Sequence, residues 1–203
     1  MANHQPSFAP ASYGLDIHQI DHAQKAIENA KNILIISHRS PDPDTIGSNL
    51  ALRNFLEQKG KKVTSACIDK LPPNSDFLTQ KQKYTENPIL NHFNLIITVD
   101  CGAENQVGFG KEYPELFKGE IPLINIDHHA SNKGFGTINL VQDKLASTTE
   151  IIFILLKHWN IKINKEIATC LLFGLYYDTG SFMHSNTTSL SLEIAKELMS
   201  SGA

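Results

Sequence analysis

Short apolar runs alternate with helical patterns along the first part of the chain. Residues 32–37 form a run rich in β-branched side chains, which is typical of a strand buried on both faces. Apolar positions then recur at helical spacing over residues 46–56, and Gly60 stands where a glycine commonly ends a helix. Residues 62–68 alternate between apolar and polar side chains as a second strand. This succession predicts two parallel strands joined by a right-handed helical crossover.

The same succession continues toward the C-terminus. Residues 95–99 and 121–126 are predicted strands, and an aspartate follows each of them. Residues 136–141 are expected to add a strand at a sheet edge, and residues 69–94 are expected to form a loop with a short helix. Helices are predicted over residues 18–30, 147–159, 165–177 and 189–199. The fold class is therefore α/β, with a mostly parallel sheet flanked by helices.

The composition is that of an ordinary folded domain. The chain has 203 residues, of which 41% are hydrophobic, and it carries a formal net charge of −3. A chain of this length can form one large domain with a well-buried core. Residues 1–14 contain prolines and few side chains that could pack, so we expect a loose N-terminal arm there and a single domain over residues 15–203.

Charge and cysteine content restrict the partners and the compartment. A mildly acidic chain is not expected to coat nucleic acid, and its only arginines, Arg39 and Arg53, offer few bidentate clamps for phosphate. The three cysteines are far apart and form no Cys-x-x-Cys pair, which disfavours disulfides and structural zinc. We therefore expect a reducing, cytoplasmic location. No apolar run approaches the roughly 20 residues that a membrane span needs, so no membrane partner is expected.

Aspartate and histidine side chains gather where predicted elements end or loops begin. They stand at four places, which are His38 with Asp42 and Asp44, Asp100, Asp127 with His128 and His129, and Asp178. The first three places follow predicted strands of one parallel sheet. Since ligands of open α/β sheets bind beyond the carboxyl ends of the strands, these side chains are expected to converge on one crevice there.

Such a cluster needs cations to offset its charge. The four aspartates at positions 42, 44, 100 and 178 together carry a charge of about −4, which two divalent ions would neutralise. Mixed carboxylate and imidazole ligands suit first-row metals, and a carboxylate-rich site favours Mn²⁺. The cluster therefore predicts a hydrolase centre in which two metal ions activate a water. Taken singly, each aspartate is also consistent with a helix cap, and one histidine of the adjacent pair with a packed core residue.

The order and spacing of these residues resemble the motifs of the DHH phosphoesterase superfamily. The match consists of His38-x-x-x-Asp42-x-Asp44, Asp100, Asp127-His128-His129 and Asp178. Residues 40–48, 127–132, 146–150 and 178–182, with Asn-Thr-Thr at 186–188, most resemble the branch of bifunctional oligoribonucleases and 3′-phosphoadenosine 5′-phosphate (pAp) phosphatases.

The resemblance implies a role for each motif residue. It implies His38 and Asp42 as ligands of one metal ion, Asp44, His128 and Asp178 as ligands of the other, and Asp100 as the bridge between them. It also implies that His129 contacts the substrate phosphate and that Asp127 orients the histidine region. The implied reaction is in-line attack of a metal-activated hydroxide on phosphorus.

The resemblance further implies a hydrolase acting on short single-stranded oligonucleotides or on pAp. Manganese pyrophosphatase and cyclic-di-AMP phosphodiesterase activities are alternatives within the superfamily. Members of this branch carry a second, C-terminal domain that grips the substrate, and we expect this chain to lack it. A catalytically weak metal- and nucleotide-binding fragment is therefore another alternative. A homodimer in which a neighbour supplies the clamp is a third, although no long apolar surface stripe supports it.

Overall fold

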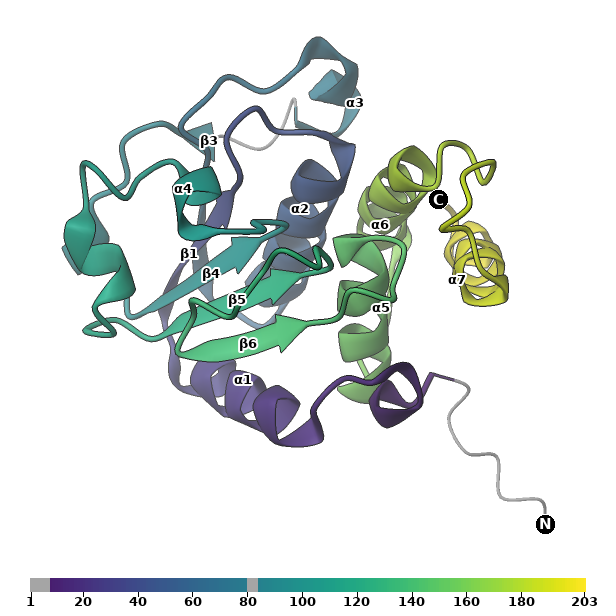
Figure 1. Ribbon diagram of the computed structural model, residues 1–203, viewed down its shortest axis with the longest axis horizontal. Coiled ribbons are helices and arrows are strands. Elements are labelled where there is room, and N and C mark those ends of the chain that lie inside the picture. Colours follow the sequence, from purple (N-terminus) through teal and green to yellow (C-terminus); the bar gives the residue numbers. More distant parts are fainter. Residues whose placement is uncertain (1–7, 80–83) are drawn as a thin grey trace.

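Six parallel strands form one sheet in the computed structural model, which describes residues 8–79 and 84–203 (Figure 1). The strands lie in the order β3-β2-β1-β4-β5-β6. Their bounds are Asn32–Ser37 for β1, Lys62–Ala66 for β2, Tyr84–Thr85 for β3, Leu95–Val99 for β4, Leu123–Asp127 for β5 and Ile138–Val141 for β6. The predicted α/β class and parallel sheet are confirmed, and β6 lies at an edge as expected.

Strand register brings three loops to the same edge of the sheet. Ser37 of β1 lies opposite Val99 of β4, and Val99 lies opposite Ile126 of β5. The carboxyl ends of these central strands are therefore level with one another. The segments that follow them, which start at His38, Asp100 and His128, leave the sheet side by side.

Helices cover one face of the sheet, and short helices with loops cover the other. The bounds are Ile17–Asn29 for α1, Pro43–Gln58 for α2, Asp76–Thr79 for α3, Glu104–Val107 for α4, Thr148–His158 for α5, Lys165–Asp178 for α6 and Ser189–Ser200 for α7. Helices α1, α2, α5 and α6 share one apolar core with the sheet, and α7 packs outside against α5 and α6 (Figure 1). A smaller core lies under α4 on the opposite face. None of the helices in the described residues has the length and hydropathy that crossing a membrane requires.

Helices α2 and α6 cross at two glycines. A Cβ atom on Gly47 would collide with the carbonyl oxygen of Cys170, and one on Gly174 would lie 2.6 Å from the Asp44 Oδ1 atom. The absence of side chains at Gly47 and Gly174 therefore lets the two helices approach closely. This approach sets Asp44, at the start of α2, against the middle of α6.

The N-terminal segment differs from the expected loose arm. Phe8 is buried and meets Phe153 of α5 edge to face, with ring centroids 4.9 Å apart. Residues Pro10–Tyr13 then form a 3-10 helix that ends at Gly14. The segment packs because Phe8 and Leu15 are apolar side chains that are buried in the main core. Residues 1–7 lie outside the described residues.

Other departures concern short elements. The two-residue strand β3, the four-residue helix α4 and 3-10 helices at Pro73–Ser75, Leu90–His92 and Pro114–Phe117 have no periodic pattern and were not expected in detail. Strand β5 begins at Leu123 instead of residue 121, because its pairing with β4 starts at Leu123, opposite Ile96. The three cysteines are buried free thiols. Residues 80–83, within the expected loop of 69–94, lie outside the described residues.

Candidate metal centre

The loop after β1 delivers His38 and Asp42. Asp42 is the N-cap of α2, since its Oδ1 atom accepts hydrogen bonds from the backbone N–H groups of Asp44 (2.9 Å) and Thr45 (3.1 Å). The same oxygen lies 3.7 Å from the Nε2 atom of His38. Asp42 therefore caps a helix, as is common for aspartate in this position, and also faces a neighbouring imidazole.

Asp100 lies between the two histidines His38 and His128. Its Oδ2 atom is 3.4 Å from Nε2 of His38, and its Oδ1 atom is 3.5 Å from Nε2 of His128. The Thr148 hydroxyl donates a hydrogen bond of 2.9 Å to Oδ1. Asp100 has a φ of +62°, which is costly for a residue other than glycine and is tolerated where the surrounding structure enforces it. This turn at the end of β4 directs the carboxylate into the cluster.

Asp44 is completely buried against the N-terminus of α5. Its Oδ2 atom accepts from the Thr148 N–H (2.7 Å), and its Oδ1 atom accepts from the N–H (3.1 Å) and hydroxyl (2.8 Å) of Thr149. These donors and the positive end of the helix dipole stabilise a carboxylate. Burial nevertheless raises the pKa of Asp44, and the carboxylates of Asp100 and Asp178 raise it further. A cation at this point would relieve that repulsion.

His128 joins Asp44 to Asp178, which lies at the last position of α6. The Nε2 atom of His128 is 3.2 Å from Oδ2 of Asp178, and its Nδ1 atom is 3.3 Å from the Leu145 carbonyl oxygen. Pairing of Nδ1 with a carbonyl leaves Nε2 facing the carboxylates. Burial opposes protonation of this imidazole, but the Asp178 hydrogen bond and the charges of Asp44 and Asp100 outweigh it and raise the pKa of His128 to about 10.

The His38 imidazole is in the same electrostatic situation. Burial again opposes its protonation, but the neighbouring carboxylates of Asp100 and Asp42 prevail and raise the pKa of His38 to about 10. Burial likewise disfavours the charged form of Asp42, but the His38 imidazole beside it lowers the pKa of that carboxyl. The carboxylates of the cluster therefore stabilise bound positive charge, either as protons on the histidines or as metal ions.

His129 lies at the exposed side of the cluster, with its Nδ1 atom 3.7 Å from Oδ1 of Asp100. Its Nδ1 atom lies 2.7 Å from Oδ1 of the fully buried Asp127, and this hydrogen bond raises the pKa of His129. The Asn132 amide donates to the other Asp127 oxygen at 2.8 Å and to the Cys101 carbonyl oxygen at 2.9 Å. Asp127 and Asn132 thus hold the ring so that its Nε2 atom is directed away from Asp127. The side chain of His129 is 42% exposed, so a ligand can reach it.

The donor set fits a divalent metal ion. Ligand atoms within 4.8 Å of one another occur in three groups, which are His38 with Asp42 and Asp100, Asp44 with His128 and Asp178, and Asp100 with His128 and His129. Carboxylate and imidazole donors of this kind suit first-row metals. All eight predicted site residues lie in or directly beside this cluster, as their positions at the ends of strands and of α6 predicted.

Several residues that support the cluster were missed by the site prediction. Thr148 and Thr149 hold Asp100 and Asp44, and Asn132 holds Asp127. A usable signal existed for the first pair, because Ser147 is an N-cap and the residues after it present free N–H groups. Asn132 carries no comparable signal, since its role depends on a contact across the loop.

Comparison with known proteins agrees with this geometry. The model of the DHH family, N-terminal domain, matches residues 32–175. The chain is 31% identical over 186 residues to the bifunctional oligoribonuclease and PAP phosphatase NrnA of Thermus thermophilus, covering 88% of this chain and 52% of that protein. It is 28% identical over 172 residues to NrnA of Bacillus subtilis, covering 82% of this chain and 52% of that protein.

A solved structure agrees over most of the chain. An exopolyphosphatase-related protein from Bacteroides fragilis superposes with a TM-score of 0.85 at 27% identity, covering 93% of this chain and 58% of that one. The chain therefore spans about half the length of the curated relatives it matches. The family match, the fold and the clustered motif residues lead to one conclusion: this chain belongs to the DHH family of phosphoesterases and carries the family's N-terminal domain.

Proposed function

We propose that this domain hydrolyses phosphate esters of short oligonucleotides or of pAp with two divalent metal ions, Mn²⁺ above all. The observation that carries the proposal is the arrangement of two ligand groups on either side of Asp100. His38 and Asp42 lie on one side, and Asp44, His128 and Asp178 lie on the other. The substrate class is supported by the names of the relatives, which are an oligoribonuclease and a PAP phosphatase.

Two bound metal ions would supply positive charge for the phosphate oxygens and would lower the pKa of a water. The residues of the chain provide the geometry. Asp100 is held between the two groups by Thr148, and Asp44 is held by the first turn of α5. The Nε2 atom of His129 is available to hydrogen-bond a phosphate oxygen, while Asp127 keeps the ring oriented through Nδ1.

Hydrolysis of a 5′-phosphorylated dinucleotide and of pAp in the presence of Mn²⁺ tests this proposal. Asp100→Asn should lower turnover by at least about 100-fold and weaken Mn²⁺ binding, since the loss of a bridging carboxylate exceeds the usual cost of losing a supporting contact. Asp143→Asn is a matched control, because Asp143 is exposed and lies outside the cluster. Pyrophosphate and cyclic-di-AMP in the same panel address the alternative activities.

Two outcomes would contradict the proposal. A wild-type chain that binds no Mn²⁺ in calorimetry would refute the metal centre itself. A chain that binds Mn²⁺ and cleaves pyrophosphate but neither nucleotide substrate would refute the substrate class and leave the metal centre standing.

A further inference from the structure

A cavity of about 420 Å³ lies directly beside the metal centre, and no role in the mechanism has been assigned to it. It is lined by Gly102, Ala103, Glu104 and Asn105 on one side and by Ser131, Lys133, Gly134 and Phe135 on the other. These segments are the loop and first turn after β4 and the loop between β5 and β6, so we call it the loop cavity. Both segments leave the sheet at the edge where the cluster lies.

The loop cavity borders on His129. A Cβ atom on Gly102 would lie 2.9 Å from the Ser131 hydroxyl oxygen and 3.3 Å from Cβ of His129. The cavity wall and the phosphate-facing histidine are therefore in van der Waals reach of each other. A substrate held at the metal centre beside His129 would extend into this cavity.

The same asparagine orders both the catalytic histidine and the cavity wall. The Asn132 amide nitrogen holds Asp127, which holds His129, while the Asn132 Oδ1 atom accepts from the Gly134 N–H at 2.8 Å. Gly134 has a φ of +79°, which turns the chain between Lys133 and Phe135. The wall is therefore preorganised relative to His129, which lowers the entropic cost of binding a ligand across both.

The lining suits a nucleoside next to a phosphate. Lys133 is exposed and forms no ion pair within residues 8–79 and 84–203, so its ammonium group is available to an anion. The Phe135 ring is half-buried and is braced edge to face by Phe117, with centroids 5.7 Å apart. A braced, partly exposed ring beside a cation is the usual combination for stacking a base and neutralising its phosphate. Glu104 on the opposite wall can accept hydrogen bonds from base N–H groups.

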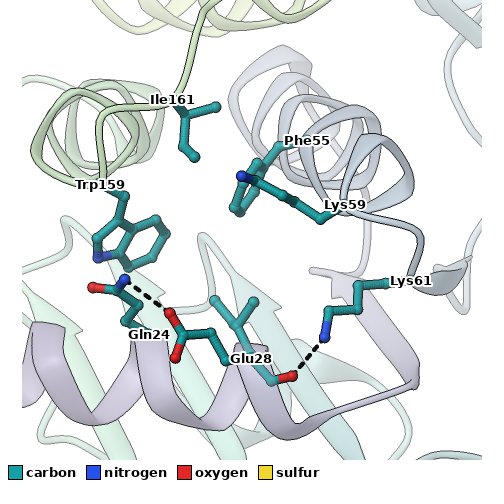
Figure 2. A pocket seen from close by; sticks show the side chains of 8 residues that line it. Gln24, Glu28, Phe55, Lys59, Lys61, Trp159 and Ile161 are labelled. Carbon is teal, nitrogen blue, oxygen red and sulfur yellow. Dashed lines mark hydrogen bonds between the residues drawn. The ribbon is translucent and has the colours of Figure 1, made fainter.

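A cavity at the opposite end of the sheet has a different character. It measures about 270 Å³ and lies between α1 and the ends of α2 and α5, where Phe55 and Trp159 stack (Figure 2). Lys61 donates to the carbonyl oxygens of Glu28 and Ala30, so this lysine already serves to end α1. Because this cavity lies at the opposite end of the sheet from the metal centre, its wall is a suitable place for a control substitution.

We infer that the loop cavity binds one of the two nucleosides that flank the cleaved phosphate, with the base stacked on Phe135 and the backbone charge paired with Lys133. The inference rests on the proposed function and extends it from phosphate esters in general to substrates with a second nucleoside. A small phosphomonoester would occupy the metal centre and leave the loop cavity empty. The cavity would therefore discriminate by substrate length.

The experiment compares a 5′-phosphorylated dinucleotide with glycerol 2-phosphate, a phosphomonoester that has no ring to stack on Phe135. Phe135→Leu keeps apolar packing on Phe117 but loses the stacking face, and it should raise KM for the dinucleotide at least about fivefold. Phe135→Tyr keeps the ring and should remain near wild type. Lys133→Ala should raise KM roughly threefold to tenfold, and the effect should shrink at high salt. None of these variants should change kcat/KM for glycerol 2-phosphate.

Lys59→Ala is the matched control, because it removes a lysine from the wall of the cavity in Figure 2. If Phe135→Leu and Lys133→Ala match Lys59→Ala on the dinucleotide, the inference is overturned while the proposed function stands on wild-type turnover. Equal losses on both substrates would also overturn it, since they would indicate a general disturbance of the metal centre. If the wild type cleaves neither substrate, the proposed function fails. Calorimetric titration with the intact dinucleotide then tests whether the loop cavity binds a nucleoside. Equal affinity of the wild type and the variants for the dinucleotide would overturn the inference.

Discussion

Asp100 shows how a single residue is adapted to a place between two imidazoles. Its backbone adopts a left-handed conformation, its side chain is 2% exposed, and a threonine hydroxyl holds one of its oxygens. The Thr148 hydroxyl is the closest donor to this buried carboxylate, at 2.9 Å, and its loss would be costly because an unsatisfied buried acceptor is unfavourable. Thr148 therefore positions Asp100 without belonging to the groups of metal-binding atoms.

Replacing Thr148 with valine tests this positioning. Thr148→Val keeps the shape of the side chain and removes the hydroxyl, so we expect Mn²⁺ affinity to fall by about 10-fold. The free energy of unfolding should fall by about 1–3 kcal/mol as the Asp100 oxygen loses its donor. Thr169→Val is a suitable control, since the Thr169 hydroxyl donates to the Lys165 carbonyl oxygen of the same helix. Unchanged Mn²⁺ affinity in calorimetry of Thr148→Val would show that the hydroxyl does not position Asp100.

Glu150, in the first turn of α5, is another buried carboxyl group, and it gives a pH-dependent prediction. Its Oε2 atom accepts from the Ala146 N–H at 2.8 Å, and the side chain is completely buried. Burial is the largest influence and raises the pKa of Glu150 above its ordinary 4.5, against the opposing effects of Ser191, the Ala146 N–H and the His128 charge; Asp178 adds to the rise. The folded state therefore holds this proton more tightly than the unfolded chain does.

The sign of the pH effect follows from that difference. Below about pH 4.5 the carboxyl is neutral in both states, and as pH rises through its higher folded pKa the buried charge lowers stability. Glu150→Gln keeps an oxygen for the Ala146 N–H and cannot ionise. Its free energy of unfolding, measured in urea from pH 4 to 8, should therefore increase relative to wild type as pH rises. A difference that is constant with pH would contradict this account of Glu150.

At the scale of elements, the crossing of α2 and α6 controls the cluster. The positions of Gly47 and Gly174 let the helices approach until Asp44 reaches the centre from one helix and Asp178 from the end of the other. Alanine is normally preferred to glycine inside a helix by roughly 0.5–1 kcal/mol. A loss of stability at Gly174 on substitution by alanine would therefore be a clear sign of steric contact between the helices.

Gly174→Ala places a methyl group 2.6 Å from the Asp44 Oδ1 atom and 2.6 Å from Cγ2 of Thr149. We expect the free energy of unfolding to fall by about 1–3 kcal/mol, as for overpacked cores, and Mn²⁺ binding to weaken because Asp44 shifts. Gly110→Ala is the matched control, since its methyl group would meet only the tip of the Phe117 ring at 3.2 Å. Denaturation curves measure the free energy of unfolding of both variants, and titrations measure their Mn²⁺ affinity. Equal stability of the two variants would argue against a tight crossing.

The length and burial of each element explain which elements the sequence could predict. Strands β1 and β4 were predicted with the correct bounds, because each is a buried apolar run in which every face is covered. The motif aspartates were found because they follow such runs. Strand β3 and helix α4 were not, since two and four residues are too few to carry a period. Their existence depends on pairing with β2 and on the cover of the second core.

The prediction of the site was limited in a similar way. His38, Asp100 and Asp178 stand out in the sequence only in combination, because several aspartates and histidines follow predicted elements that end at one edge of the sheet. Thr148 and Asn132 act through hydrogen bonds to side chains that lie 48 and 5 residues away along the chain. Polar residues of this kind are common in loops and at helix starts, so only the folded structure distinguishes them.

At the scale of the whole molecule, the cluster connects elements from both halves of the chain. Its side chains come from the loops after β1, β4 and β5, from α2 and from the end of α6. In the unfolded chain these residues are dispersed over positions 38–178, so metal ions bind the folded state far more tightly. Metal binding should therefore stabilise the entire domain, including α6, and the effect should be visible without any substrate.

The expected increase in the free energy of unfolding follows from mass action. Mn²⁺ at 100 times its dissociation constant should add about 2.7 kcal/mol to the free energy of unfolding. For a domain of this size that corresponds to a rise in Tm of roughly 5–10 °C over the protein in chelator. Asp100→Asn should lose most of this rise, whereas Asp143→Asn should retain it. A wild-type Tm that is the same in Mn²⁺ and in chelator, measured by calorimetry, would contradict a metal centre built across these elements, whatever the domain does with phosphate esters.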